Sequence, residues 1–140
     1  MKNLEKLAGV NAPLNYLCAY AGMTYEALYP DRQITIAYGT RSRAEQERLL
    51  KQGKSLTRRS YHLTGDAVDM YIVDLLNGEV RQDKKDYEEL DAILQAAADR
   101  MGSIVTWGGH WKRLVDLGHW QIEQTLADKM AYNGVVSELS

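Results

Sequence analysis

The chain has 140 residues, of which 45% are hydrophobic and 26% are charged, a balance typical of one globular domain. Its formal net charge is −2, which argues against a nucleic-acid-binding protein because such proteins usually carry a basic surplus. The single cysteine, Cys18, excludes an intrachain disulfide and a cysteine metal cluster.

The first half of the chain predicts a helix, a strand and a second helix. Apolar residues recur at helical spacing over 14–21, after Pro13, which suits a first helical turn, and before Gly22, which suits a helix end. The stretch "QITIAYG" (33–39) alternates in a way that predicts a strand. A capping-box pattern, S-x-x-E, then predicts a helix from Ser42 to about Gln52.

The second half predicts three strands and one long helix. In "AVDMYIVDLLNGEV" (67–80), Val68, Met70 and Ile72 share one face of a strand, and Asn77-Gly78 is a hairpin signal. Amphipathic spacing predicts a helix over 85–101, ended by Gly102. "SIVTW" (103–107) and "HWQIE" (119–123) are two further short strands. We therefore expect residues 1–140 to form a single α+β domain, with a small antiparallel sheet flanked by helices.

Two of the three histidines lie near carboxylates in patterns that suit a metal site. His62 and Asp69 belong to one short segment, in which Gly65 lets the backbone turn. His119 supplies a third ligand, and catalytic zinc commonly has three protein ligands drawn from imidazole and carboxylate groups. Asp116, three residues before His119, suits a general base. A histidine and an aspartate in a loop are more often hydrogen-bonded surface residues, and spacing alone leaves the ion undetermined.

Four motifs resemble those of a known family of zinc peptidases. "SYHLTGDAVD" (60–69) matches, without a gap, the S-x-H-x-x-G-x-A-x-D signature of zinc peptidases that act on bacterial cell-wall peptides. These include D-alanyl-D-alanine carboxypeptidases of the vancomycin-resistance type and phage L-alanyl-D-glutamate endopeptidases. "DLGH" (116–119) is similar to the second motif, "GTRSRAEQ" (39–46) to the G-x-R segment, and "WGGHW" (107–111) to the W-G-G-x-W stretch of phage members. The resemblance spans about residues 34–123.

The resemblance implies a hedgehog/D-Ala-D-Ala metallopeptidase-like fold with a catalytic zinc ion. The implied zinc ligands are His62, Asp69 and His119. Asp116 is implied as the catalytic base, and Arg41 as the cation that steadies the developing oxyanion or a substrate carbonyl. Ser60 is implied as a hydrogen-bonding partner of the substrate or of a ligand. Asp116 is the shorter base, an aspartate rather than a glutamate, which occurs in the phage branch.

Several of these positions also have plain structural readings. Without the motif, Arg41 reads as an exposed arginine at a helix start. We expect Trp120 to be buried and Trp107 to line the cleft edge and contact the substrate. Glu123 is either an ordinary strand residue or a carboxylate that hydrogen-bonds a ligand histidine. His110 stands where phage relatives often carry an acidic residue, and no ligand role is assigned to it.

The expected function is that of a phage endolysin that hydrolyses the L-Ala–D-Glu bond of peptidoglycan stem peptides. A D-alanyl-D-alanine carboxypeptidase and a non-catalytic zinc-binding relative stay open as alternatives, the latter disfavoured by the presence of Asp116 and Arg41. No signal peptide or membrane anchor is evident, so we expect a protein made in the cytoplasm that reaches the host cell wall after a holin opens the membrane. We also expect the protein to be a monomer. Seventeen residues follow Glu123, too few for a separate cell-wall-binding domain.

Overall fold

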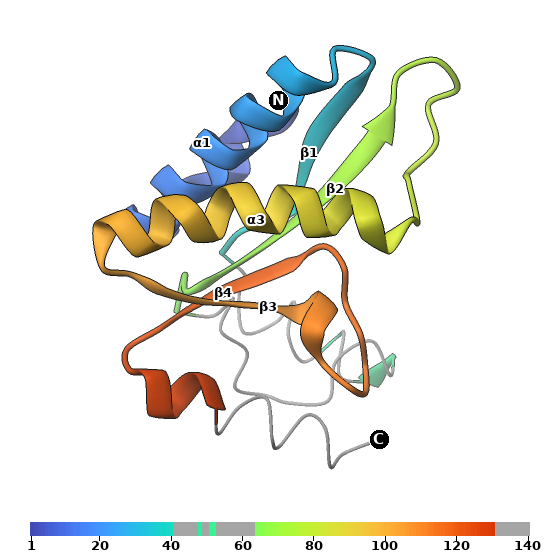
Figure 1. The fold of residues 1–140 in the computed structure, drawn as a ribbon. Helices are drawn as coiled ribbons and strands as arrows, with labels where there is room; N and C mark the ends of the chain where they lie inside the picture. The colour runs from blue at the N-terminus through green and yellow to red at the C-terminus, as the bar shows by residue number, and fades with distance from the viewer. Residues whose placement is uncertain (41–47, 49–50, 53–63, 131–140) are drawn as a thin grey trace.

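The computed structural model describes residues 1–40, 48, 51–52 and 64–130, and Figure 1 shows how their helices and strands are arranged. In chain order these are the 3-10 helix η1 (Leu4–Leu7), α1 (Ala12–Leu28), β1 (Arg32–Tyr38), β2 (Ala67–Asp74), α3 (Lys84–Met101), β3 (Ile104–Trp107), the 3-10 helix η2 (Gly108–His110) and β4 (His119–Glu123). The predicted α+β class is confirmed. The predicted helix over 42–52 lies almost entirely outside the described residues.

Four strands form one antiparallel sheet in the order β1-β2-β4-β3. Strands β2 and β4 are therefore neighbours, although β3 and α3 lie between them in the sequence. In their register Asp69 lies opposite His119. Because side chains alternate between the two faces of a strand, this register places both residues on the same face of the sheet.

Helices α1 and α3 pack together over one face of the sheet and bury its apolar side chains (Figure 1). Burying one large apolar side chain contributes roughly 1.5–3 kcal/mol, so this face carries most of the stabilising contacts. The opposite face of β2, β4 and β3 carries side chains that are buried but polar. These are Asp69, Thr106, His119, Gln121 and Glu123.

Helix α1 is longer than predicted, because it continues through Gly22 to Leu28. A Cβ at position 22 would lie 2.5 Å from Met1 Cε and 3.3 Å from Ile34 Cγ2. Gly22 therefore marks a close approach of the helix to the N-terminal residue and to β1, and the prediction of a helix end there is wrong. Tyr25, beyond the predicted end, is fully buried, and this tertiary packing stabilises the additional turns.

Helix α3 begins within one residue of the predicted position and ends at the predicted one. The Asp83 side chain accepts a backbone N–H of the first turn, and Gly102 ends the helix in the left-handed conformation, with φ of 70°. The turn at Asn77-Gly78 is also present, but the strand after it is reduced to a single bridge between Val73 and Val80. The hairpin is short because the chain leaves the sheet to begin α3.

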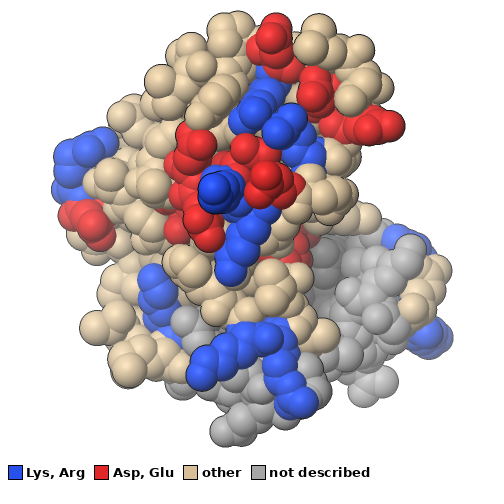
Figure 2. Space-filling view, turned by 45° about the vertical axis from the view of Figure 1, so that its right-hand side comes forward, with Lys and Arg blue, Asp and Glu red and all other residues tan. Residues whose placement is uncertain are grey.

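An ion-pair network joins the end of the sheet to α3. Asp86 of α3 accepts from Arg32 Nη1 at 3.2 Å and from Arg81 Nε at 2.7 Å, and Arg81 Nη1 lies 3.4 Å from Asp74 Oδ2. Figure 2 shows acidic and basic side chains lying side by side on one face of the molecule. Partly exposed pairs contribute about 0–1 kcal/mol each, so this network adds modestly to the stability that the apolar core provides.

Candidate metal centre

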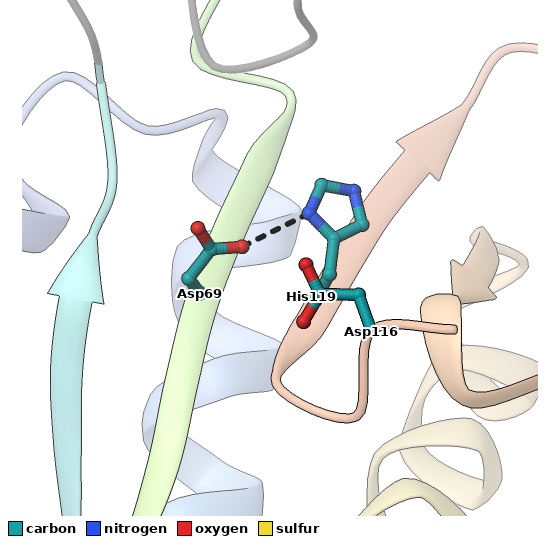
Figure 3. Close-up of side chains that lie close together, drawn as sticks. All are labelled: Asp69, Asp116 and His119. Atoms are coloured by element: carbon teal, nitrogen blue, oxygen red, sulfur yellow. Dashed lines mark hydrogen bonds and ion pairs between the residues drawn. The ribbon is translucent and has the colours of Figure 1, made fainter. Parts of the chain in front are cut away.

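Asp69 and His119 meet across strands β2 and β4, on the polar face of the sheet (Figure 3). His119 Nδ1 lies 2.9 Å from Asp69 Oδ1, and the two residues are only 8% and 6% exposed. The strand alternation expected from the sequence is confirmed, since Asp69 points away from the face that carries Val68 and Met70. An imidazole and a carboxylate so close together and so buried share either a proton or a cation.

Burial and charge act in opposite directions on the His119 imidazole. Burial lowers its pKa, because the charged form loses its solvation. The hydrogen bond to Asp69, the charges of Asp69 and Asp116, and the hydrogen bond to Gln121 raise it, and the net effect is a raised pKa. The surroundings of His119 therefore favour positive charge, which a proton or a metal ion can supply.

Asp116 approaches this pair from the turn that leads into β4 (Figure 3). Its Oδ1 accepts the Gly118 N–H at 3.2 Å, and its own backbone N–H donates to Gly108 O at 3.1 Å. A Cβ at position 108 would lie 2.6 Å from the carbonyl oxygen of Asp116, so glycine is required where the "WGGHW" segment packs against this turn. The Asp116 carboxylate is thereby held beside Asp69 and His119.

The donor atoms of Asp69, Asp116 and His119 all lie within 4.8 Å of one another. Two carboxylates and one imidazole are donor types that zinc accepts, with bonds of about 2.0–2.2 Å. The raised pKa of His119 fits the same conclusion, because it reflects a site that favours a cation. The structure thus brings together three residues singled out from the sequence, and as a donor set they fit a divalent metal ion. Their individual roles as ligands and base stay predictions.

Three predicted site residues lie outside the described part of the chain, namely Arg41, Ser60 and His62. Their proposed roles stay predictions. The described chain resumes at Thr64, whose hydroxyl donates to Asp66 Oδ2 at 2.8 Å. Gly65 O accepts the Asn11 N–H at 2.8 Å, so the residues directly before β2 are fixed beside the start of α1.

Trp107 lies in the core, which corrects the expectation that it lines the cleft edge. Its side chain is 1% exposed, and its ring stacks on Trp120 with 6.3 Å between centroids. Its Nε1–H donates to Leu117 O at 2.7 Å, within the turn between Asp116 and His119. A large ring whose single polar atom has a partner is well suited to burial. Trp107 therefore supports the turn that carries Asp116, and Trp120 is buried as predicted.

Two residues near the centre carry no motif signal of their own. Gln121 is fully buried; its Oε1 lies 2.7 Å from His119 Nε2, and its Nε2 donates to Glu123 Oε1 at 2.7 Å. Glu123 thus reaches the histidine through Gln121. Tyr71 shares the Asp69 face of β2, and burial together with the nearby carboxylates raises its pKa. The period of two along each strand is the signal that points to both, because each lies two residues from a predicted ligand.

The buried imidazole of His119 and the carboxylates of Asp69 and Asp116 form a donor set that can hold a divalent metal ion. The chain belongs to the phage L-alanyl-D-glutamate peptidase family, whose model matches residues 1–131. This match confirms the family and the enzyme class, a peptidoglycan-degrading hydrolase, that the sequence motifs predict.

The fold is similar to that of a solved structure, the L-Ala D-Glu endopeptidase ChiX of Serratia marcescens. The two share 34% sequence identity with a TM-score of 0.70, and the match covers 85% of this chain and 84% of that one. No significant match was found among curated protein sequences. The structural likeness confirms the predicted peptidase fold over most of the chain.

Proposed function

We propose that this protein is a zinc-dependent endopeptidase that hydrolyses the L-Ala–D-Glu bond of peptidoglycan stem peptides. The observation that carries this function is the meeting of Asp69, Asp116 and His119 within 4.8 Å in a chain of the phage L-alanyl-D-glutamate peptidase family. The Serratia protein, which is 34% identical over most of both chains, is named as an endopeptidase for the same L-Ala–D-Glu bond. Fold, donor set and family therefore support one activity.

Asp69 and His119 are the described residues that would hold the zinc ion, and His62 is the proposed third ligand. Zinc, when bound, polarises a carbonyl group and lowers the pKa of water from 15.7 to about 7. The sheet register holds Asp69 and His119 opposite each other, which supports their proposed role as a pair of ligands. Arg41 and Ser60 are proposed to steady the substrate carbonyl oxygen and to hydrogen-bond the substrate.

Asp116 is the proposed base. The Gly118 N–H holds one of its oxygens, which gives the half-buried carboxylate a defined orientation beside His119. Asp116 takes a proton from water as the oxygen of that water attacks the L-Ala carbonyl carbon. It passes the proton to the D-Glu nitrogen as the C–N bond breaks. General acid–base catalysis of this kind typically contributes ~10²–10⁴-fold to the rate.

Digestion of purified peptidoglycan, followed by mass spectrometry, tests this function. The zinc-loaded protein is expected to release fragments with new L-Ala C-termini and D-Glu N-termini, and a chelator is expected to abolish the release. Asp116→Ala is expected to lower the rate by about 10²–10⁴-fold and to retain zinc, because the variant lacks only the base. Asp99→Ala removes an exposed carboxylate of α3 and serves as the matched control.

Two results would contradict the proposed function. Removal of terminal D-alanine alone would identify a D-alanyl-D-alanine carboxypeptidase. Zinc binding with no cleavage of either bond would identify a non-catalytic zinc-binding relative.

We also propose that the protein acts on the cell wall of a phage host during lysis, as an endolysin. Its family supports this setting. Within the part of the chain that the structure describes, no helix has the length and apolar character needed to cross a bilayer. A monomeric state and release through a membrane opened by a holin stay predictions.

A further inference from the structure

Hydrogen bonds connect four buried polar residues in series along the polar face of β4 and β3. His119 Nε2 lies 2.7 Å from Gln121 Oε1, and Gln121 Nε2 donates to Glu123 Oε1 at 2.7 Å. Thr106 Oγ1 donates to the same Glu123 oxygen at 3.1 Å. These residues are between 0% and 8% exposed. Their hydrogen bonds therefore lie largely out of contact with water.

Glu123, which lies at the other end of this series of hydrogen bonds from His119, determines the orientation of the Gln121 amide. A carboxylate has only acceptor atoms, so the groups that Glu123 Oε1 meets have to be donors. Gln121 presents its NH₂ group to Glu123 and is left with its carbonyl oxygen toward His119. The reverse orientation would place two acceptor oxygens 2.7 Å apart in a buried position, where such a contact is unfavourable. An acceptor facing His119 Nε2 requires a hydrogen on that nitrogen.

Nδ1, the other nitrogen of the ring, faces Asp69, the neighbouring proposed ligand (Figure 3). Nδ1 lies 2.9 Å from Asp69 Oδ1, and the residues His119 and Asp69 form the candidate donor group together with Asp116. A protonated ring donates to Asp69 and Gln121 at once. A cation in place of the Nδ1 proton would leave the bond from Nε2–H to Gln121 unchanged. Metal-binding histidines usually donate their second ring N–H to a carboxylate, carbonyl or water, and an amide oxygen occupies that place here.

We propose that Gln121, oriented by Glu123, is a positioning residue that holds the hydrogen of the His119 ring on Nε2 and thereby presents Nδ1 to the metal ion. This role rests on the proposed function, since it concerns a ligand of the proposed zinc site. It extends that function to two further residues of β4, Gln121 and Glu123. Gln121 and Glu123 act on the metal only through His119.

Nuclear magnetic resonance of the zinc-loaded wild-type protein gives the first test. Long-range proton–nitrogen spectra of the His119 ring are expected to show zinc on Nδ1 and a slowly exchanging hydrogen on Nε2. Zinc on Nε2, or an Nε2 hydrogen that exchanges as fast as that of an exposed histidine, would overturn the proposed role. This measurement needs no variant, so it decides the question even where a substitution prevents folding.

Zinc affinity, measured by competition with a chelator, gives the second test. Gln121→Leu is expected to bind zinc about 10–100-fold more weakly, the usual cost of losing an outer partner of a metal ligand. The exchange variant Q121E/E123Q keeps the net charge and restores the pattern, because the carboxylate at position 121 accepts from His119 and the amide at position 123 donates to that carboxylate. It is expected to recover most of the affinity. Gln95→Leu, which removes a half-buried glutamine of α3 that bonds Asp91, is the matched control.

A purely structural role would give a different pattern. Folded Gln121→Leu would then bind zinc as tightly as the wild type and lose only thermal stability, and that result would overturn the proposed role. The two proposals also fail separately. Zinc bound through Nδ1 without peptidoglycan cleavage contradicts the proposed function alone, whereas zinc-dependent cleavage with Nε2 bound to the metal contradicts the role of Gln121 alone.

Discussion

The imidazole of His119 has a polar partner at each nitrogen, Asp69 at 2.9 Å and Gln121 at 2.7 Å. Its pKa is raised because these partners and Asp116 outweigh the effect of burial. A proton and a metal ion therefore compete for the same nitrogen, as they do at most histidine ligands. At the residue scale the centre is thus built to favour a cation before any substrate is considered.

Asp91 offers a prediction about pH, away from the metal centre. It is 6% exposed, and its Oδ1 accepts from Trp120 Nε1 at 3.0 Å and from Gln95 Nε2 at 3.1 Å. Burial raises its pKa, and the two hydrogen bonds only partly oppose that effect. The folded state therefore binds the Asp91 proton more tightly than the unfolded state. Consequently, this residue lowers the free energy of unfolding as pH rises from the unfolded pKa through the folded pKa.

In Asp91→Asn, an amide oxygen accepts the same two hydrogen bonds without a charge to desolvate. The stability of this variant relative to wild type is expected to rise over that pH interval and to stay constant up to neutral pH. Urea denaturation of both proteins from acid to neutral pH measures the difference. A relative stability that falls with rising pH would show that the hydrogen bonds to the charged form outweigh its burial.

At the scale of the elements, the turn between η2 and β4 connects the core to the metal centre. Trp107 stacks on Trp120 inside the core and donates to Leu117 O in this turn. The backbone of Asp116 is bonded to Gly108 O in the same region. The position of the Asp116 carboxylate therefore depends on packing underneath the site as much as on the residues around it.

Two matched tryptophan substitutions test this dependence. Trp107→Phe removes the donor to Leu117 O, and Trp120→Phe removes the donor to Asp91 on the other side of the stacked pair. Each removes one hydrogen bond of a buried tryptophan and is expected to cost about 0.5–1.5 kcal/mol of unfolding free energy. Only Trp107→Phe is expected to lower kcat as well, by up to about 10²-fold, because it loosens the turn that carries Asp116.

Peptidase kinetics at a temperature where both variants are folded, together with denaturation curves, separate these effects. Equal losses of kcat in both variants would mean that Trp107 contributes only to core packing.

At the scale of the whole molecule, one face of the sheet forms the apolar core and the other carries the candidate metal centre. Helices α1 and α3 bury the apolar face, and the other face gathers the buried polar residues of β2, β3 and β4. The candidate metal centre brings donor atoms of Asp69, Asp116 and His119 within 4.8 Å of one another. A cation that binds only the folded state should therefore stabilise the entire domain.

Zinc at 100 times its Kd is expected to raise the free energy of unfolding by about 2.7 kcal/mol. Asp69→Asn removes the charge of a proposed ligand and is expected to lose most of this gain. Urea denaturation with zinc and with a chelator measures both proteins. An equal gain in the variant would show that zinc binds at another place on the chain.

The sequence by itself determined those features that have short-range causes. The extent of α3 follows from amphipathic spacing and its end from Gly102, the strands follow from alternation, and the spacing of the motifs singles out Asp69, Asp116 and His119. Caps, alternation and spacing act over a few residues, so they can be read without knowing the neighbours in space.

Only the tertiary structure decided which distant segments meet. It set β2 beside β4, continued α1 through Gly22, buried Trp107 beneath the Asp116 turn, and placed Gln121 between His119 and Glu123. Each of these depends on contacts between residues far apart along the chain or on which strand faces which. The free energy of such contacts comes from burial and hydrogen bonding in the folded state. Residue spacing along the sequence therefore does not predict which distant residues make them.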